Sequence, residues 1–134
     1  PSASDFQDLK LESGRSFYEI VAENVAEWGK ELRGDSGYSS VGAVVGATWP
    51  EQAKLLRKIM PENFILVPGY GAQGGTGETV SGCFDGKGKG AIVNASRSIM
   101  LAYRKNGSSG EDIQSAAYNE AVRMRDDLNN HIFA

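Results

Sequence analysis

The sequence is poor in the residues that build covalent or metal-bound scaffolds. Its 134 residues include one cysteine, Cys83, and one histidine, His131. A single cysteine excludes an internal disulfide and indicates a reducing, cytoplasmic setting. Cys83 is therefore expected to be a small packed residue rather than a nucleophile. His131 lies close to the C-terminus, and neither a metal site nor a catalytic role is expected for it.

Positive charge and long apolar runs are also scarce. The net charge is −3 and the pI is near 5.2, which argues against a nucleic-acid partner. No apolar run approaches the roughly 20 residues of a membrane-spanning helix, so no membrane partner is expected. At this length the sequence predicts one domain. The chain begins at Pro1 rather than at a methionine, which indicates processing or a missing upstream segment.

Glycine, by contrast, is in excess. There are 17 glycines, nearly twice the usual share of roughly 7%, and many lie between Gly69 and Gly90. The segment FILVPGYGAQGGTGE (64–78) reads as a short strand that runs into a glycine-rich turn. Within it, Gly69, Gly71 and Gly74 stand at G-x-G-x-x-G spacing, so the clustering indicates a local demand on the backbone.

Hydrophobic periodicity predicts alternating helices and strands. Helices are expected at about 15–32, 50–60, 76–84, 97–105 and over a long segment after residue 110. Strands are expected at about 39–48, 64–68 and 91–96. Such alternation is typical of parallel strands joined by right-handed crossovers, which is an α/β architecture.

Several side chains have structural interpretations. The first long helix has an apolar face on which Trp28 is expected to pack. Trp49 is expected to pack likewise, or alternatively to line the ligand mouth, because it follows a strand end. Thr48 has capping-box spacing to Glu51, which predicts that Thr48 caps the next helix. The strand at 39–48 is expected to be covered on both faces. The acidic pair near the C-terminus is expected to form a polar helix face: Asp126 and Asp127.

Two polar segments follow neighbouring strands and are expected at the same edge of the sheet. In parallel α/β units the loops after strands form the ligand side. Gln73 lies in the glycine-rich loop, and Ser96 and Arg97 follow the third strand. Exposed backbone N–H groups together with a forked guanidinium suit a monophosphate. The turn that contains Lys87 and Lys89 precedes a strand and is expected at the opposite edge.

Other interpretations of the loop stay open. A dinucleotide fingerprint needs a clear helix after Gly74 and an acidic residue about 20 positions later. The expected helix is short, and Asn94 stands where the acid is required; an NADP variant would use Arg97 for the 2′-phosphate. A further alternative is a plain tight turn, with Arg97 in a surface ion pair.

Four segments carry a family resemblance. GAVVGAT (42–48), LVPGYGAQGG (66–75) and GAIVNASRS (90–98) resemble the last three strands of orotidine 5′-phosphate decarboxylase, in its longer bacterial subclass. The opening PSASDFQDL (1–9) resembles the segment after that family's fifth strand. The resemblance covers essentially the whole chain and implies one unit over 1–134. That unit would be the C-terminal half of a (β/α)8 TIM barrel, with three parallel strands and flanking helices. A whole barrel takes about 250 residues, so the N-terminal half would be absent from this chain.

The resemblance also implies a function, namely decarboxylation of orotidine 5′-phosphate (OMP) to UMP in pyrimidine biosynthesis, without a metal or organic cofactor. At matching positions, Gln73 would contact the pyrimidine and phosphate ends of the ligand. Arg97 and the amides around Ser96 would grip the phosphate. Two residues would form part of the base pocket, Pro68 and Gly69, and Gly71 completes the substrate-binding set.

The sequence departs from the family in one large respect. The family's catalytic charges come from a D-x-K-x-x-D motif in the first half of the barrel, with one Asp supplied by the neighbouring subunit. No copy is present here, because Gly90 stands where the second Asp would complete the pattern begun by Asp85 and Lys87. The chain is therefore expected to hold no catalytic residue and to be inactive alone. Its expected partners are the N-terminal half of the same enzyme and a second subunit in a homodimer.

Two alternative functions stay open: a non-catalytic phosphate-binding half-barrel module, and another phosphate-binding TIM-barrel enzyme with different catalytic residues upstream. In either case a half-barrel exposes strand edges and apolar surface. The chain is therefore expected to associate.

Overall fold

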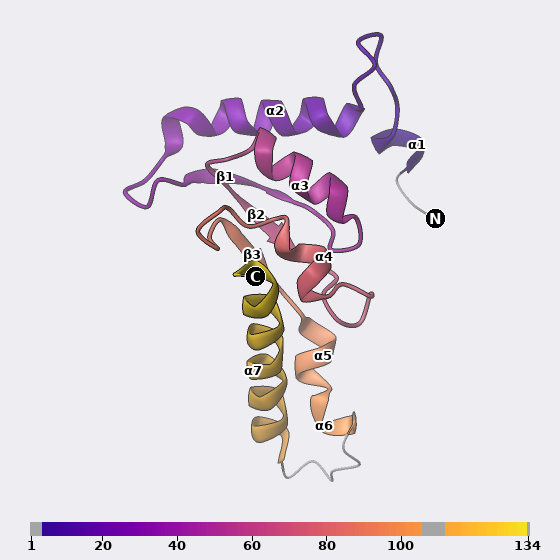
Figure 1. Ribbon diagram of the computed structural model, residues 1–134, viewed down its shortest axis with the longest axis vertical. Coiled ribbons are helices and arrows are strands. Elements are labelled where there is room, and N and C mark those ends of the chain that lie inside the picture. The colour runs from indigo at the N-terminus through magenta and orange to yellow at the C-terminus, as the bar shows by residue number, and fades with distance from the viewer. Residues whose placement is uncertain (1–3, 106–111, 134) are drawn as a thin grey trace.

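Helices and strands alternate along the chain, as the sequence predicts (Figure 1). The computed structural model describes residues 4–105 and 112–133. The strands are β1 (Ser39–Val44), β2 (Asn63–Val67) and β3 (Ala91–Val93). The helices are α1 (Ser4–Gln7), α2 (Phe17–Gly29) with the 3₁₀ turn η1 (Lys30–Leu32), α3 (Pro50–Ile59), α4 (Gly77–Ser81), α5 (Ser96–Met100), α6 (Ala102–Lys105) and α7 (Ile113–Ile132).

The three strands form one parallel sheet in the order β1-β2-β3, which confirms the predicted fold class. β2 and β3 pair in register from Ile65 opposite Ala91 to Val67 opposite Val93. The β1–β2 pairing has an irregularity between Ser39 and Ala43. Gly42 lies in it, and a Cβ atom there would come within 2.5 Å of the Phe64 carbonyl oxygen.

The core lies on the helical side of the sheet. Side chains from β2, α3, α4 and α7 meet there in one cluster of buried residues. Its most enclosed members are Met60, Ile65, Val67, Val80 and Cys83. The core therefore packs these helices against the central strand, and the opposite face of the sheet lies outside the core.

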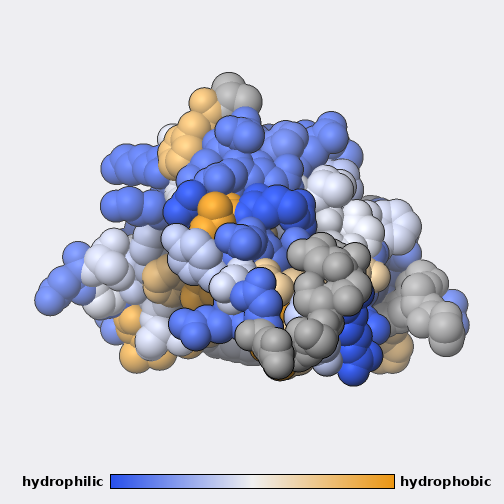
Figure 2. Space-filling view, turned by 90° about the horizontal axis from the view of Figure 1, so that it is seen from below, coloured by the Kyte–Doolittle hydropathy of each residue, from blue (hydrophilic) through white to orange (hydrophobic). Residues whose placement is uncertain are grey.

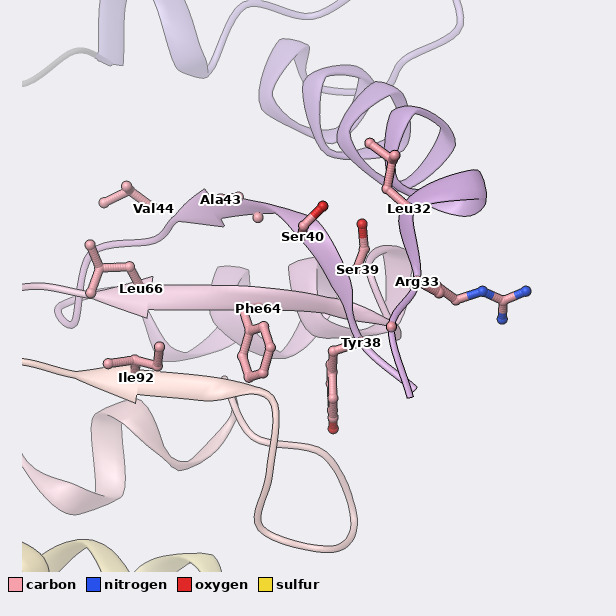
Figure 3. A pocket seen from close by; sticks show the side chains of 12 residues that line it. Leu32, Arg33, Tyr38, Ser39, Ser40, Ala43, Val44, Phe64, Leu66 and Ile92 are labelled. Carbon is pink, nitrogen blue, oxygen red and sulfur yellow. The ribbon is translucent and has the colours of Figure 1, made fainter. Parts of the chain in front are cut away.

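That opposite face is apolar and open. Val44, Leu66 and Ile92 are 67%, 41% and 55% exposed, and together with Phe64 and Tyr38 they line a shallow hollow (Figure 3). The expectation that the first strand is covered on both faces is thus wrong. In the described part of the chain, the helices whose side chains form the core all pack against the opposite face of the sheet from this hollow.

The apolar face predicted for the first long helix, α2, is buried at Val25 but not at Trp28. Trp28 is 62% exposed, and the buried residues of α2 are small ones: Ala22, Val25 and Gly29. The small residues face inward because α2 lies very close to β1. A Cβ atom on Gly29 would lie 2.7 Å from the Ser39 hydroxyl oxygen.

The start of α3 corrects two further expectations. The helix begins at Pro50 after the N-cap residue Trp49, and no side chain caps it. The predicted Thr48 cap is therefore absent. Trp49 is 63% exposed rather than packed. The face of the molecule seen from below is mostly hydrophilic with separate apolar patches (Figure 2).

We expect the chain alone to self-associate through the open sheet face. A double variant in which Leu66 and Ile92 are each replaced by lysine adds charge to this face and leaves the core residues unchanged. Burial of such side chains is worth about 1.5–3 kcal/mol each, so the double variant should weaken association at least roughly tenfold. Light scattering over a concentration series measures this. Tyr118→Lys, on the exposed side of α7, is the matched control, and a stable monomer of the unaltered chain would contradict the expectation.

Candidate functional site

The segments predicted to bind ligand lie at one edge of the sheet. β2 runs into the glycine-rich loop (residues 68–76), and the neighbouring β3 runs into α5. Gln73, Ser96 and Arg97 are all exposed there. The guanidinium of Arg97 forms no hydrogen bond or ion pair with any residue that the structure describes. Its guanidinium is thus not held in a surface ion pair with a described residue.

The base of the loop is fixed by both neighbouring strands. The backbone N–H of Ala47, beyond β1, donates to the Pro68 carbonyl at 3.0 Å. On the other side, the N–H of Asn94, just after β3, donates to the Val67 carbonyl at 3.2 Å. Pro68 and Gly69, the residues predicted to lie in the base pocket, are half-buried at this junction.

Backbone conformation explains the glycines of the loop. Gly69, Gly71 and Gly74 have φ angles of 100°, 75° and 91°, a region that residues with a Cβ atom rarely adopt. Gly75 is required for another reason, because a Cβ atom there would lie 2.6 Å from the Cβ of Ala47. The loop is therefore a tightly folded turn, with α4 of only five residues after it.

Most amides within the loop are already used. The N–H of Gly71 donates to Gly75 O at 2.8 Å, and the N–H of Gly75 donates to Gly69 O at 3.1 Å. The amides of Ala72 and Gly74 also donate inside the loop, at 3.1 and 2.9 Å. The expectation that this loop offers exposed N–H groups is wrong for these four residues. They set the shape of the loop instead.

The loop packs on its own side chain and on α5. A Cβ atom on Gly69 would lie 3.0 Å from Oε1 of Gln73, so the amide of Gln73 lies over Gly69. A Cβ atom on Gly71 would lie 3.1 Å from Oγ of Ser98. Ser98 is buried, and its hydroxyl has no hydrogen-bond partner among the described residues. The loop and the residue after Arg97 are thus in contact.

Sequence reasoning missed Asp127. Its Oδ2 accepts hydrogen bonds from the Tyr70 hydroxyl at 2.6 Å and from the Gly77 backbone N–H at 2.7 Å. Asp127 is therefore an anchor for the loop as well as part of a polar helix face. Burial, followed by this hydrogen bond, raises the pKa of Tyr70 to about 12. The same hydrogen bond lowers the pKa of Asp127, so the carboxylate form is favoured.

Three further titratable side chains make structural contacts, those of Cys83, His131 and Asp85. Cys83 is fully buried, which confirms that it is a packed residue, and burial raises the pKa of its thiol to about 11. Nδ1 of His131 lies 2.7 Å from the backbone oxygen of Asp127. Asp85 accepts from the backbone N–H groups of Lys87 and Lys89, at 2.8 Å each. Within residues 4–105 and 112–133, no three metal-ligating side chains come together.

Comparison with known proteins agrees with the fold. No protein-family model matches the chain. It is 46% identical over 129 residues to an orotidine 5′-phosphate decarboxylase of Caldicellulosiruptor bescii, and 43% identical over 126 residues to that of Clostridium botulinum. The predicted resemblance is confirmed. The two alignments include 96% and 94% of this chain, respectively. The chain spans only 41% of the Caldicellulosiruptor enzyme and 44% of the Clostridium enzyme.

Solved structures of orotidine monophosphate decarboxylases share the fold. An orotidine monophosphate decarboxylase structure from Toxoplasma gondii superposes on this chain with a TM-score of 0.75 at 25% identity. The match covers 98% of this chain and 48% of the Toxoplasma chain. The Leishmania donovani decarboxylase gives a TM-score of 0.69 at 28% identity, and the match covers 98% of this chain and 44% of the Leishmania chain.

Across the described residues, no helix combines the length and apolar character needed to cross a bilayer.

Proposed function

We propose that this chain supplies the phosphate- and base-binding half of an orotidine 5′-phosphate decarboxylase, the enzyme that converts OMP to UMP. The observation that carries the proposal is the 46% identity to such a decarboxylase over 96% of the chain. The two loops at the carboxyl edges of β2 and β3 support it, because neighbouring parallel strand ends are where such folds bind ligands.

Each residue of the proposed site has a chemical role. Arg97 binds the phosphate with its guanidinium, which is exposed and has no described partner, and a forked guanidinium suits bidentate phosphate recognition. Ser96 adds its hydroxyl and backbone amide. Gln73 contacts both the pyrimidine and the phosphate. Pro68 and Gly69 line the base pocket, and Gly71 shapes the loop beside them.

The reacting end of the substrate depends on groups outside this chain. The sequence holds no D-x-K-x-x-D motif, so we propose that the proton donor and the paired carboxylates come from the N-terminal half of the barrel and from a second subunit. No metal or organic cofactor is part of the proposal. Phosphate binding on this chain then positions OMP, and its binding energy is expressed at the distant reacting carbon. We further propose that residues 1–134 act as one half-barrel unit in the cytoplasm.

UMP binding tests the phosphate site. We expect UMP to raise the melting temperature of the chain, because a ligand that binds only the folded state stabilises it. Arg97→Ala removes charge-assisted hydrogen bonds worth about 1.5–3 kcal/mol, so its affinity for UMP should fall roughly 10- to 100-fold. A thermal-shift titration of both proteins measures the two effects.

The matched control is Arg125→Ala. Arg125 is an exposed arginine of α7 that bonds only its neighbour Asp126 among the described residues. This variant should bind UMP as the unaltered chain does. If UMP shifts Arg97→Ala and the unaltered chain equally, or shifts neither, the proposed phosphate site is wrong.

A further inference from the structure

The glycine-rich loop is tied to the C-terminal helix through one oxygen atom. Oδ2 of Asp127 accepts from Tyr70, near the start of the loop, and from Gly77, just after its end. The contact is close on the backbone side too, because a Cβ atom on Gly77 would lie 2.5 Å from the Asp127 carbonyl oxygen. Residues at both ends of the loop therefore donate hydrogen bonds to a single side chain of α7.

We propose that Asp127 is a positioning residue for the ligand-binding loop, acting through Tyr70 and Gly77 to hold the loop in the orientation that presents Gln73. This inference rests on the proposed function, since it assigns to α7 a part in UMP binding. Asp127 itself need not touch the ligand. Its role is to fix where the loop stands relative to α5 and Arg97.

The loop's own bonds do not supply this orientation. The hydrogen bonds among Gly69, Gly71 and Gly75 define the shape of the turn, and the bond from Ala47 to Pro68 fixes only its base. The helix that follows, α4, has five residues, and so short a helix is not stable without tertiary contacts. Asp127 supplies one such contact at the N-terminus of α4, where a carboxylate also interacts favourably with the helix dipole.

A graded set of variants separates positioning from general stability. Asp127→Ala removes the acceptor of both bonds, and Tyr70→Phe removes one donor. Asp127→Asn keeps an amide oxygen that can accept from both donors, so it serves as the conservative rescue. Asp126→Asn removes the same charge from the adjacent residue, which is exposed and bonds only Arg125 among the described residues. It is the matched control.

The first measurement needs no ligand. Amide hydrogen exchange of Gly71, Gly75 and Gly77, followed by NMR, reports how often the loop opens. Loss of hydrogen bonds to a charged acceptor should accelerate this exchange at least about tenfold in Asp127→Ala. Tyr70→Phe should give an intermediate acceleration, Asp127→Asn a small one and Asp126→Asn none. If exchange in Asp127→Ala matches that in Asp126→Asn, the proposal is overturned.

The second measurement is UMP affinity, at a temperature where every variant is fully folded. We expect about tenfold weaker binding by Asp127→Ala, substantial rescue by Asp127→Asn and no change in Asp126→Asn. Unchanged affinity in Asp127→Ala, with a faster-exchanging loop, would reduce Asp127 to a structural residue and overturn the proposal. Absence of UMP binding by the unaltered chain would instead count against the proposed function, and the exchange data alone would then decide whether Asp127 orients the loop.

Discussion

Alone, this chain is expected to convert no OMP to UMP, and activity is expected to appear when a polypeptide that carries the rest of the barrel is added. The phosphate- and base-binding residues of the proposed site are here, but the sequence holds no D-x-K-x-x-D motif. Positioning without a proton donor leaves the chemical step unassisted. The effect is measured by using chromatography to detect UMP formation. The assay is run with each polypeptide separately and with both together.

The open sheet face gives the physical reason to expect assembly. Val44, Leu66 and Ile92 present apolar surface with no cover from the described helices. Strands added at the edges of β1 and β3 would turn this surface into the interior of a closed barrel, which removes exposed edges altogether. Arg97→Ala in the same mixture should lower kcat/KM at least about tenfold. Turnover by the isolated chain would contradict the assignment of the catalytic groups to another segment.

The order of elements was predictable because it follows from local patterns. Short apolar runs mark β1, β2 and β3, and strand–helix alternation then implies parallel pairing. Two of the strands are shorter than predicted, since β1 ends at Val44 and β3 at Val93, whereas β2 has the predicted length. Apolar composition continues beyond β1, at Val45 and Ala47, whereas the regular ladder stops there.

Burial was less predictable, because periodicity identifies an apolar face without saying what covers it. Trp28 and Val44 belong to apolar patterns, yet both are exposed in the described part of the molecule. The buried residues of α2 are Ala22, Val25 and Gly29, and at Gly29 a Cβ atom would lie only 2.7 Å from the Ser39 hydroxyl oxygen. The apolar pattern therefore identified the buried Val25 but misplaced Trp28.

Of the candidate site, sequence reasoning found the loops but not their supports. Strand-end topology brings the loop of Gln73 next to α5 and Arg97, and this needs only the fold. The bond between Tyr70 and Asp127 joins residues 57 positions apart, and no local pattern marks it. The same holds for the buried Arg57, which reads in the sequence as one more charge on an amphipathic helix.

Substitution of Arg57 is expected to have the largest effect on stability. Arg57 is only 6% exposed, and burial lowers the pKa of its guanidinium. Nη1 donates to Gly90 O at 2.9 Å and to Cys83 O at 3.3 Å, while Nη2 donates to Asn63 O at 2.7 Å and also to Met60 O. The side chain thereby connects α3 to the segments at which β2 and β3 begin.

Arg57→Met should lower the free energy of unfolding by about 3–5 kcal/mol, because it leaves buried carbonyl groups without a donor. That is a large part of the 5–15 kcal/mol typical of a domain. Arg57→Lys keeps the charge but reaches fewer carbonyls, so an intermediate loss is expected. Urea unfolding measures all three proteins, with Lys58→Met, the exposed neighbour on the same helix, as the control. A loss in Arg57→Met no larger than in Lys58→Met would show that these carbonyls do not depend on the guanidinium.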